Sequence, residues 1–305
     1  MQVKAEKYHR PFLLSNPFPW LLCCRFHDLM VKNAMKDNEW WKEAIKNAKI
    51  LSDIELVFRR LWPSQFPKPF RKPLINFPDV IIHASETSVK KHPFYSAAKT
   101  GDVEAAAELL RDTFNPDAIG ALKTLLQGRK PILISAHAFE DEGVNAIPEA
   151  FAEMLAEKLG LQVESGIVQT NVVGHTGSDG FGRLARQPSF TGNVFEGQEY
   201  LIVDDFVGMG GTLANLKGYI ESKGGIVIGA TTLTGKSYSA KLAPDSKTLQ
   251  ELRGKHGKEL EDWWKEKFDH TFDCLTQSEA RYLLKTKNAD RVRDRITEAE
   301  QERNR

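Results

Sequence analysis

The chain has 305 residues, of which 41% are hydrophobic and 27% charged, and its formal net charge is +1. This composition is that of a globular protein with a core, and it excludes collagen-like, wholly disordered and disulfide-scaffold classes. The charge is unevenly distributed along the chain. Residues 1–95 carry 16 basic and 9 acidic side chains, residues 96–240 carry 11 and 18, and residues 241–305 carry 15 and 14. The change of sign near residue 95 indicates a boundary.

The cysteine content and the N-terminal sequence predict a cytoplasmic protein. Cys23 and Cys24 are adjacent and Cys274 is alone, which makes no disulfide framework. The first 26 residues contain three prolines and lack the apolar region of a signal peptide. No run approaches the ~18 apolar residues of a membrane span, so we expect no membrane association.

The first third of the chain reads as helix, connector and helix. Residues 1–60 are rich in aromatic residues at near-helical spacing. Five prolines between Pro63 and Pro78 then disfavour a regular helix and favour an extended segment. A short strand is expected at 80–82, and a helical pattern follows at 93–110.

From residue 131 the pattern alternates between strands and helices. The expected order is strand 131–135, helix 146–160, strand 161–170, Gly-rich loop 171–198, strand 199–205, helix 211–224 and strand 225–233. Apolar strands that alternate with helices predict an α/β fold with a parallel, Rossmann-like sheet flanked by helices. In residues 241–305, 29 of 65 positions are ionisable, and this segment reads as helical throughout.

The most informative stretch is Tyr200 to Leu213, YLIVDDFVGMGGTL. An apolar strand ends in two carboxylates, Asp204 and Asp205, and a glycine-containing loop then leads to Thr212 and a helix. Glycines let backbone N–H groups approach a phosphate, and the helix N-terminus adds its dipole. Two carboxylates beside such a turn suit a ribose diol, bound directly or through hydrated magnesium. The pattern therefore indicates a ribose 5-phosphate ligand.

These residues resemble the signature of the type I phosphoribosyltransferases, which is a hydrophobic strand, two acidic residues, three variable positions, Thr or Ser, Gly, a small residue and Thr. The positions that match are Val203, Asp204, Asp205, Gly210, Gly211 and Thr212. Met209 stands where the family usually has a hydroxyl residue, so the phosphate would rely on backbone donors and Thr212. The expected order of elements in 131–236 is also that of the family core.

The resemblance implies a role for each part of the site. The ribose 5-phosphate would be bound by Gly208, Met209, Gly210, Gly211 and Thr212. The pyrophosphate would lie in the loop after the first core strand, formed by Ser135, Ala136, His137 and Ala138. The loop 171–198 would close over the reacting centre and bring Arg183 and Arg186 to the pyrophosphate. Lys236 is a possible contact to a base, and Asp204 and Asp205 would act in catalysis and hold Mg2+ through water.

The implied reaction is the displacement of pyrophosphate from phosphoribosyl pyrophosphate by a nitrogen acceptor, such as a nucleobase, with Mg2+ as cofactor. The acceptor is not identified by the sequence. The resemblance also implies a homodimer. A second hypothesis is a non-catalytic protein that senses phosphoribosyl pyrophosphate or a nucleotide, for example an effector in a bacterial anti-phage cassette of the retron type.

The core accounts for about half of the chain. We expect three parts, a mainly helical, basic N-terminal extension at 1–92, a phosphoribosyltransferase-like core at 93–240 and a charged helical extension at 241–305. Either extension could supply the variable hood that chooses the acceptor in this family. The basic N-terminal extension could also bind a protein or nucleic-acid partner.

Overall fold

The computed structural model describes residues 68–135, 139–140, 143–171 and 179–303, all within the unit Ile50–Arg305. The helices expected at 1–60 and most of the proline-rich connector lie outside these residues. From residue 68 to Val80 the chain contains no helix or strand, as the prolines predict. No helix in the described part of the chain combines the length and the apolar character that crossing a membrane requires.

The centre of the structure is a five-stranded sheet in the order β1-β9-β8-β2-β5, in which every pair is parallel. Its strands are β1 (Ile81–Ala84), β2 (Ile132–Ser135), β5 (Gln162–Glu164), β8 (Glu199–Val207) and β9 (Ile226–Gly235). β8 lies in the middle and is among the two longest strands. The expected α/β fold with a parallel sheet is confirmed.

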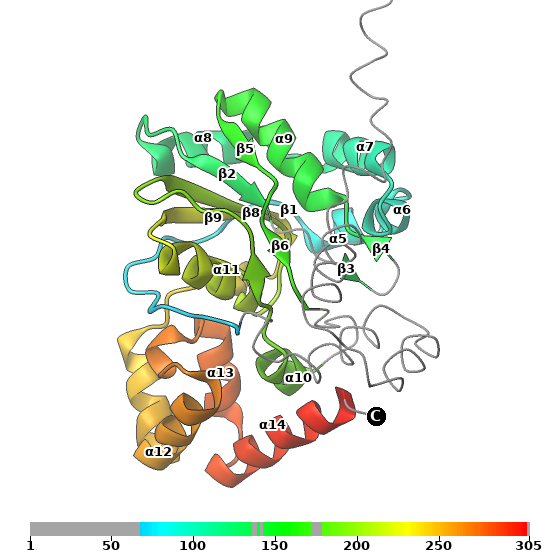
Figure 1. Cartoon of the computed structure of the whole chain (residues 1–305). Helices are drawn as coiled ribbons and strands as arrows, with labels where there is room; N and C mark the ends of the chain where they lie inside the picture. Colours follow the sequence, from blue (N-terminus) through cyan, green and yellow to red (C-terminus); the bar gives the residue numbers. More distant parts are fainter. Residues whose placement is uncertain (1–67, 136–138, 141–142, 172–178, 304–305) are drawn as a thin grey trace, which may run out of the picture. The chain divides into compact units, whose positions relative to one another are not determined.

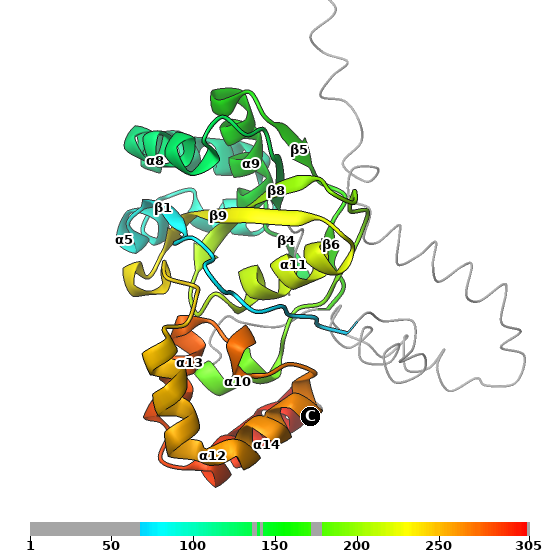
Figure 2. The same ribbon diagram turned by 90° about the vertical axis from the view of Figure 1, so that its left-hand side faces the viewer.

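Helices cover both faces of the sheet, as Figures 1 and 2 show. One face packs against α5 (Glu86–Lys90), α6 (Tyr95–Lys99), α7 (Val103–Thr113), α8 (Pro116–Leu126) and α9 (Ile147–Leu159). The other face packs against α11 (Gly211–Ser222) and the segment around Leu74 and Phe77. Along β8, Leu201 and Val203 belong to the first core and Tyr200 and Ile202 to the second. This alternation is the two-residue period of a strand that is buried on both faces.

Capping residues and glycines in the sequence explain where several helices begin and end. The Asn115 side chain accepts a hydrogen bond from Asp117 N–H, and Pro116 occupies the first turn of α8. This helix was not among the elements expected from the sequence. The helix expected at 93–110 is two helices, α6 and α7, since Gly101 adopts a φ of 107° between them. Gly160 ends α9 in the left-handed conformation, at the position where the helix expected at 146–160 ends.

Two expectations about the middle of the core were wrong. The strand expected at 161–170 is two short strands in different sheets, β5 and β6 (Val168–Gln169). The loop expected at 171–198 contains a helix, α10 (Gly180–Ala185), and a strand, β7 (Phe190–Thr191), that pairs with β6. The Asp179 side chain accepts from Gly182 N–H and starts α10. The remaining short pair is β3 (Phe139–Glu140) with β4 (Gly143–Val144).

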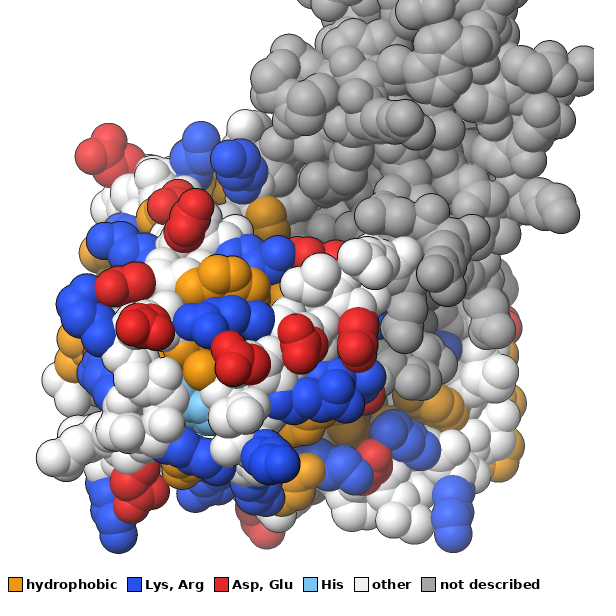
Figure 3. All heavy atoms as spheres, turned by 90° about the horizontal axis from the view of Figure 1, so that it is seen from below, with side chains coloured by type: hydrophobic (Ala, Val, Ile, Leu, Met, Phe, Trp, Pro, Cys, Tyr) orange, Lys and Arg blue, Asp and Glu red, His pale blue; other side chains and the backbone are white. Residues whose placement is uncertain are grey.

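The C-terminal segment is helical, as expected. It comprises α12 (Ser246–Phe268), α13 (Gln277–Lys285) and α14 (Ala289–Arg303), with short 3-10 turns at Ser237–Ser239 and Phe272–Cys274. These helices share a third apolar core with α10, centred on the fully buried Trp264. The face seen from below in Figure 3 carries basic and acidic side chains that intermingle over its surface.

A buried ion pair joins the C-terminal helices to the sheet. Arg71 donates to both carboxylate oxygens of Glu279 on α13, at 2.6 and 3.0 Å, and its Nε donates to Asn215 Oδ1 on α11 at 2.6 Å. The two charged side chains are 1% and 2% exposed. α11 passes close to the same segment, because a Cβ on Gly218 would meet the carbonyl oxygen of Phe70 at 2.2 Å. Three segments distant in sequence therefore meet at Arg71.

Removal of Arg71 should leave the Glu279 carboxylate buried without its partner. We expect Arg71→Met to lower the free energy of unfolding by roughly 3–5 kcal/mol, measured by urea denaturation. The matched control is Arg295→Met. Arg295 is a third exposed in its ion pair with Asp179, so this substitution should lower the free energy of unfolding by less than about 1 kcal/mol. Equal losses in the two variants would contradict this role for Arg71.

Candidate functional site

The candidate site is built around the carboxyl end of β8. β8 continues two residues past Asp205 to Val207, because β9 still pairs with it there. β2, its neighbour on the other side, ends at Ser135, opposite Val203. Asp204 and Asp205 therefore lie where β8 no longer pairs with β2 but still pairs with β9. This position frees one side of the strand for a ligand.

Asp205 is held by two donors from the helical layer. Lys99 Nζ on α6 lies 3.2 Å from Asp205 Oδ2, and Asn145 Nδ2 donates to the same oxygen at 2.9 Å. The Asn145 amide is itself oriented, because its Oδ1 accepts from Ile147 N–H at the start of α9. The Asp205 side chain is 14% exposed. These two hydrogen bonds, one of them from the charged Lys99 ammonium, fix the position of the largely buried Asp205 carboxylate before any ligand binds.

Asp204 is in a different electrostatic environment. Its Oδ1 accepts a hydrogen bond from the Asp205 backbone N–H at 2.9 Å. Burial, and then the negative charge of Asp205, raise the pKa of the Asp204 carboxyl well above its usual range. The Asp205 N–H bond and the charge of Lys99 oppose that shift. The acidic pair, Asp204 and Asp205, therefore carries a repulsion that a bound cation would relieve.

The glycine turn, Gly208–Gly211, follows β8 and opens α11. Gly210 is the N-cap of α11 and adopts a φ of 83°, a conformation that favours glycine. The turn is packed against the C-terminal helices: Thr276 Oγ1 donates to the Met209 carbonyl at 2.5 Å, and a Cβ on Gly210 would meet a methyl of Leu242 at 2.3 Å. Beside Gly211 lies the Glu279 carboxylate, 2.8 Å from where a Cβ would stand. The C-terminal segment thus covers one side of the glycine turn.

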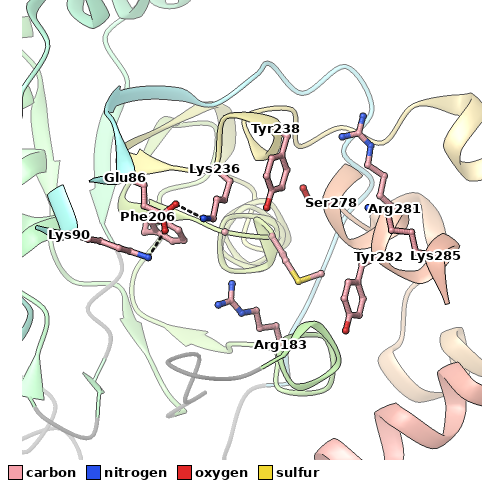
Figure 4. A pocket seen from close by; sticks show the side chains of 12 residues that line it. Glu86, Lys90, Arg183, Phe206, Lys236, Tyr238, Ser278, Arg281, Tyr282 and Lys285 are labelled. Atoms are coloured by element: carbon pink, nitrogen blue, oxygen red, sulfur yellow. Dashed lines mark hydrogen bonds and ion pairs between the residues drawn. The ribbon is translucent and has the colours of Figure 1, made fainter. Parts of the chain in front are cut away.

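The other side of the turn faces a cavity of about 580 Å³ (Figure 4). It is formed by the ends of β8 and β9, by α5 and α10, and by one face of α13. Its lining residues are Glu86, Lys90, Arg183, Phe206, Gly208, Met209, Lys236, Tyr238, Ser278, Arg281, Tyr282 and Lys285. Five of these side chains are cationic and one is anionic, so the cavity suits an anionic ligand.

The two arginines expected at the pyrophosphate are placed differently. Arg183 on α10 points into the cavity, and its Nη1 lies 2.6 Å from where a Cβ on Gly208 would be. The structure therefore brings it to the glycine turn. Arg186, at the C-terminal end of the same helix, donates from Nε to the Gly182 carbonyl at 3.2 Å and does not line this cavity.

Lys236 lies at the far wall of the cavity, directly after β9. It forms an ion pair with Glu86, and Lys90 donates to the same carboxylate at 2.6 Å. Hydrogen bonds from Lys236 and Lys90 hold the pKa of Glu86 below its usual range. Lys90 Nζ also lies 4.3 Å from the centre of the Phe206 ring. The position suits a contact to an aromatic ligand, which remains a prediction for Lys236.

The loop expected to receive pyrophosphate is only partly within the described residues. Ser135 ends β2, is 1% exposed, and its Oγ has no hydrogen-bond partner in the part of the chain that the structure describes. Residues 136–138, which include His137, lie outside that part. An unpartnered buried hydroxyl is costly and indicates a position where a ligand or water completes the bonding. Thr212 lies in the first turn of α11 and does not line the cavity.

Mg2+ held through water by Asp204 and Asp205 stays a prediction, and the oxygen donors at the end of β8 are compatible with it. Within the described ranges, no three His, Cys, Asp or Glu side chains come together to hold a metal. Mg2+ commonly keeps several waters and is bound by one or two carboxylates together with phosphates of the substrate. The acidic pair supplies two such carboxylates, and a divalent charge would offset the burial and the repulsion by Asp205 that raise the pKa of Asp204.

Sequence reasoning missed the residues that converge from outside the motif. Lys99 and Asn145 reach Asp205 from α6 and the start of α9, and no sequence signal marks them. The α13 side of the cavity did carry a signal, since its four lining residues are spaced at i, i+3, i+4 and i+7, which places them on one helix face. These residues are Ser278, Arg281, Tyr282 and Lys285.

No family model matches this chain. Among curated proteins, it is 41% identical over 239 residues to protein TraN of Escherichia coli, a match that covers 78% of this chain and 53% of the relative. It is 43% identical over 180 residues to an uncharacterized protein of Haemophilus influenzae, covering 59% of this chain and 38% of that one. The chain thus spans about half or less of the curated relatives it matches, and neither name states an activity.

Among the solved structures to which this chain is similar are an adenine and a hypoxanthine phosphoribosyltransferase. The adenine phosphoribosyltransferase of Thermoanaerobacter pseudethanolicus is 22% identical, with 46% of this chain and 74% of that one covered and a TM-score of 0.27. The hypoxanthine phosphoribosyltransferase of Staphylococcus aureus is 16% identical, with 46% and 67% covered and a TM-score of 0.27. At these TM-scores the likenesses carry no argument beyond the names, and the fold rests on the strand order given above.

The raised pKa of Asp204 predicts a pH-dependent stability. A carboxyl whose pKa is higher in the folded than in the unfolded state stabilises the fold most at low pH, and this contribution is lost as the pH rises through the folded value. Asp204→Asn keeps the acceptor oxygen and removes the charge. Without Mg2+, we expect its melting temperature at pH 8 to exceed that of the wild type by roughly 2–4 °C.

The same comparison at pH 4 should show a smaller difference, since Asp204 is then closer to neutral and resembles the uncharged Asn. The control is Asp290→Asn on α14, an exposed carboxyl that should change the melting temperature by less than about 2 °C. Differential scanning fluorimetry from pH 4 to 8 measures all three proteins. A lower melting temperature for Asp204→Asn at pH 8 would contradict the electrostatic account.

Proposed function

We propose that this protein binds phosphoribosyl pyrophosphate with Mg2+ and transfers the ribose 5-phosphate to a nitrogen acceptor. The observation that carries the proposal is the acidic pair, positioned at the carboxyl end of the middle strand and directly before the glycine turn that opens α11. In open parallel sheets, ligands bind outside the carboxyl ends of the strands. The fixed position of Asp205 and the cationic cavity beside the turn both support it.

The proposed chemistry requires positioning more than covalent participation. The bond between the anomeric carbon and the pyrophosphate oxygen breaks, and a bond from that carbon to the acceptor nitrogen forms. Pyrophosphate leaves with the electron pair, and the acceptor nitrogen loses its proton. Asp204 and Asp205 would orient the ribose hydroxyls, and backbone N–H groups of Gly208 to Thr212 would bind the 5-phosphate.

The leaving group develops negative charge, which needs cations nearby. Arg183 is the side chain of α10 that reaches the glycine turn, and Ser135 stands at the end of β2 where the pyrophosphate loop begins. Mg2+, held through water by the acidic pair, would neutralise part of this charge when bound. Lys236 would then meet the acceptor from the end of β9.

A second function, binding without transfer, is favoured by one observation. Thr276 and Leu242 pack directly against Met209 and Gly210, so the C-terminal helices contact the turn that would receive the 5-phosphate. A ligand that displaces or tightens this contact would change how α13 packs against the glycine turn. In that case the protein would sense phosphoribosyl pyrophosphate or a nucleotide, as an effector of the anti-phage type would.

Several finer expectations accompany the proposal. They are a cytoplasmic location, a homodimer, and a protein or nucleic-acid partner for the basic residues 1–92. The division into an extension at 1–92, a core at 93–240 and an extension at 241–305 is likewise a proposal. In the structure, β1 lies before residue 93 and pairs with β9, so a strand of the proposed extension belongs to the central sheet.

Isothermal titration calorimetry with phosphoribosyl pyrophosphate tests the proposal. We expect binding that requires Mg2+ and that Asp204→Asn/Asp205→Asn weakens tenfold or more, because loss of charge-assisted contacts is worth about 1.5–3 kcal/mol each. The control is Glu259→Gln/Asp262→Asn, which removes the same two charges from exposed positions of α12.

Pyrophosphate release in the presence of nucleobases then separates the two functions. Release with one acceptor supports transfer, and Mg2+-dependent binding without release for any acceptor supports sensing. The proposal fails if the wild type does not bind phosphoribosyl pyrophosphate, or if the control variant loses as much affinity as the variant of the acidic pair.

A further inference from the structure

The helix that carries Arg183, α10, packs against the C-terminal helices. Figures 1 and 2 show it next to α13 and α14. Phe181 and Leu184 are buried in the third core together with residues of α12, α13 and α14. In the part of the chain that the structure describes, neither of the two sheet cores includes a residue of α10. The position of α10 therefore depends on the C-terminal segment.

The sequence of α10, GFGRLA, does not favour a helix by itself. Two of its six residues are glycine, which is the least favourable residue in a helix after proline. A helix much shorter than about 12 residues is also marginal in water without tertiary packing. The Asp179 side chain caps the first turn, but it satisfies only the Gly182 N–H. Contacts with other segments must therefore supply the remaining stability of α10.

Gly180 allows α10 to pack closely on α13. A Cβ on Gly180 would lie 2.3 Å from Cζ of the Tyr282 ring, so no side chain fits between the two helices at this point. The Phe181 ring packs edge-on against the same tyrosine, with 5.0 Å between the ring centres. The glycine that weakens α10 as an isolated helix is thus the residue that lets it approach α13.

Arg295 on α14 contacts α10 in two ways. Its Nη2 donates to Oδ2 of Asp179, while Oδ1 of the same carboxylate caps the helix. Its guanidinium carbon lies 5.5 Å from the centre of the Phe181 ring. Its Nη1 donates to Glu298, further along α14, at 3.0 Å, which orients the guanidinium. One side chain thus binds both the capping residue and the first aromatic residue of α10.

We propose that Arg295 is a positioning residue, which fixes α10 and thereby holds Arg183 at the glycine turn. Arg295 does not line the cavity, whereas Arg183 points into it from α10 (Figure 4). If α10 left the C-terminal helices, it would carry Arg183 away from Gly208, which its Nη1 approaches. The inference deepens the proposed function and rests on it for the ligand that Arg183 meets. It gives α13 and α14 a part in building the site.

Hydrogen–deuterium exchange of the full chain without ligand tests whether Arg295 holds α10. We expect the amides of α10 to exchange roughly five- to tenfold faster in Arg295→Met, because loss of an ion pair and a ring contact favours local opening. Asp179→Asn keeps an oxygen that can cap the helix, and it should loosen α10 to a similar extent. The matched control is Arg293→Met, which lies on the same helix, is similarly exposed and pairs with Asp290 of α14 itself.

Gly180→Ala tests the contact with α13 without removing a charge. Alanine favours a helix more than glycine does, but its methyl group would overlap the Tyr282 ring. We therefore expect this variant to speed exchange in α10. The control is Gly120→Ala on α8, where a Cβ would meet no atom within 4 Å, so exchange in α8 should not become faster. Slower exchange of α10 in Gly180→Ala would contradict its close packing on α13.

Calorimetry with phosphoribosyl pyrophosphate and Mg2+ tests whether Arg295 acts through Arg183. Arg295→Met should weaken binding roughly fivefold in the wild type. In an Arg183→Gln background the same substitution should weaken binding less than about twofold, because the side chain that Arg295 positions is already gone. A merely structural loss would be equal in the two backgrounds.

The inference is overturned if Arg295→Met costs the same affinity with and without Arg183. It is also overturned if α10 exchanges in Arg295→Met as it does in the wild type, or if Arg293→Met loosens α10 as much. Failure of the wild type to bind phosphoribosyl pyrophosphate would instead contradict the proposed function, and the exchange measurement would still decide whether Arg295 holds α10.

Discussion

The buried ion pair between Arg71 and Glu279 is the interaction on which the geometry of the site depends. Arg71 precedes the sheet, Glu279 lies on α13, and Asn215, which accepts from the same guanidinium, lies on α11. Arg71 is 144 residues from Asn215 and 208 residues from Glu279 along the chain, and the three segments meet in the first half of α11. Neither charge could remain there without the other, because an unpaired charge in such a position carries a large desolvation cost. The pair therefore holds α13 against the glycine turn.

Because α13 is held against the glycine turn, the site has two halves of opposite charge. The sheet supplies the acidic pair, in which burial and then the charge of Asp205 raise the pKa of Asp204, and a bound cation would relieve the repulsion between the two carboxylates. The ends of β8 and β9 together with α5, α10 and α13 supply a cavity with a positive excess that favours phosphates. The glycine turn follows the acidic pair along the chain, with Gly208 three residues after Asp205, and Gly208 lines the cavity. A magnesium complex of a phosphorylated ligand would satisfy both halves at once.

The sequence predicted those parts of the fold whose signals are local. Apolar alternation and the glycine at 160 located the strands and helices of the core, and the spacing of Asp204, Asp205 and the glycines located the turn. It failed where short elements depend on distant partners, as for β6 and β7, which pair only with each other across the segment that was expected to be a loop. It also missed Lys99 and Asn145, because tertiary packing rather than spacing brings them to the acidic pair. The helical spacing of the α13 residues marks one face of that helix but does not show that this face lines the cavity. Of the two arginines expected at the pyrophosphate, Arg183 lines the cavity and Arg186 does not, a difference that depends on α10 being a helix.

The central claim is that the acidic pair holds a divalent cation together with a phosphoribosyl ligand. Electron paramagnetic resonance of Mn2+, used in place of Mg2+, tests this directly, because free and bound Mn2+ give different signals. With phosphoribosyl pyrophosphate present, the wild type should bind one Mn2+ per chain, and Asp204→Asn/Asp205→Asn should leave the added Mn2+ free. Equal binding of Mn2+ by both proteins, or no binding by the wild type in the presence of the ligand, would contradict the account.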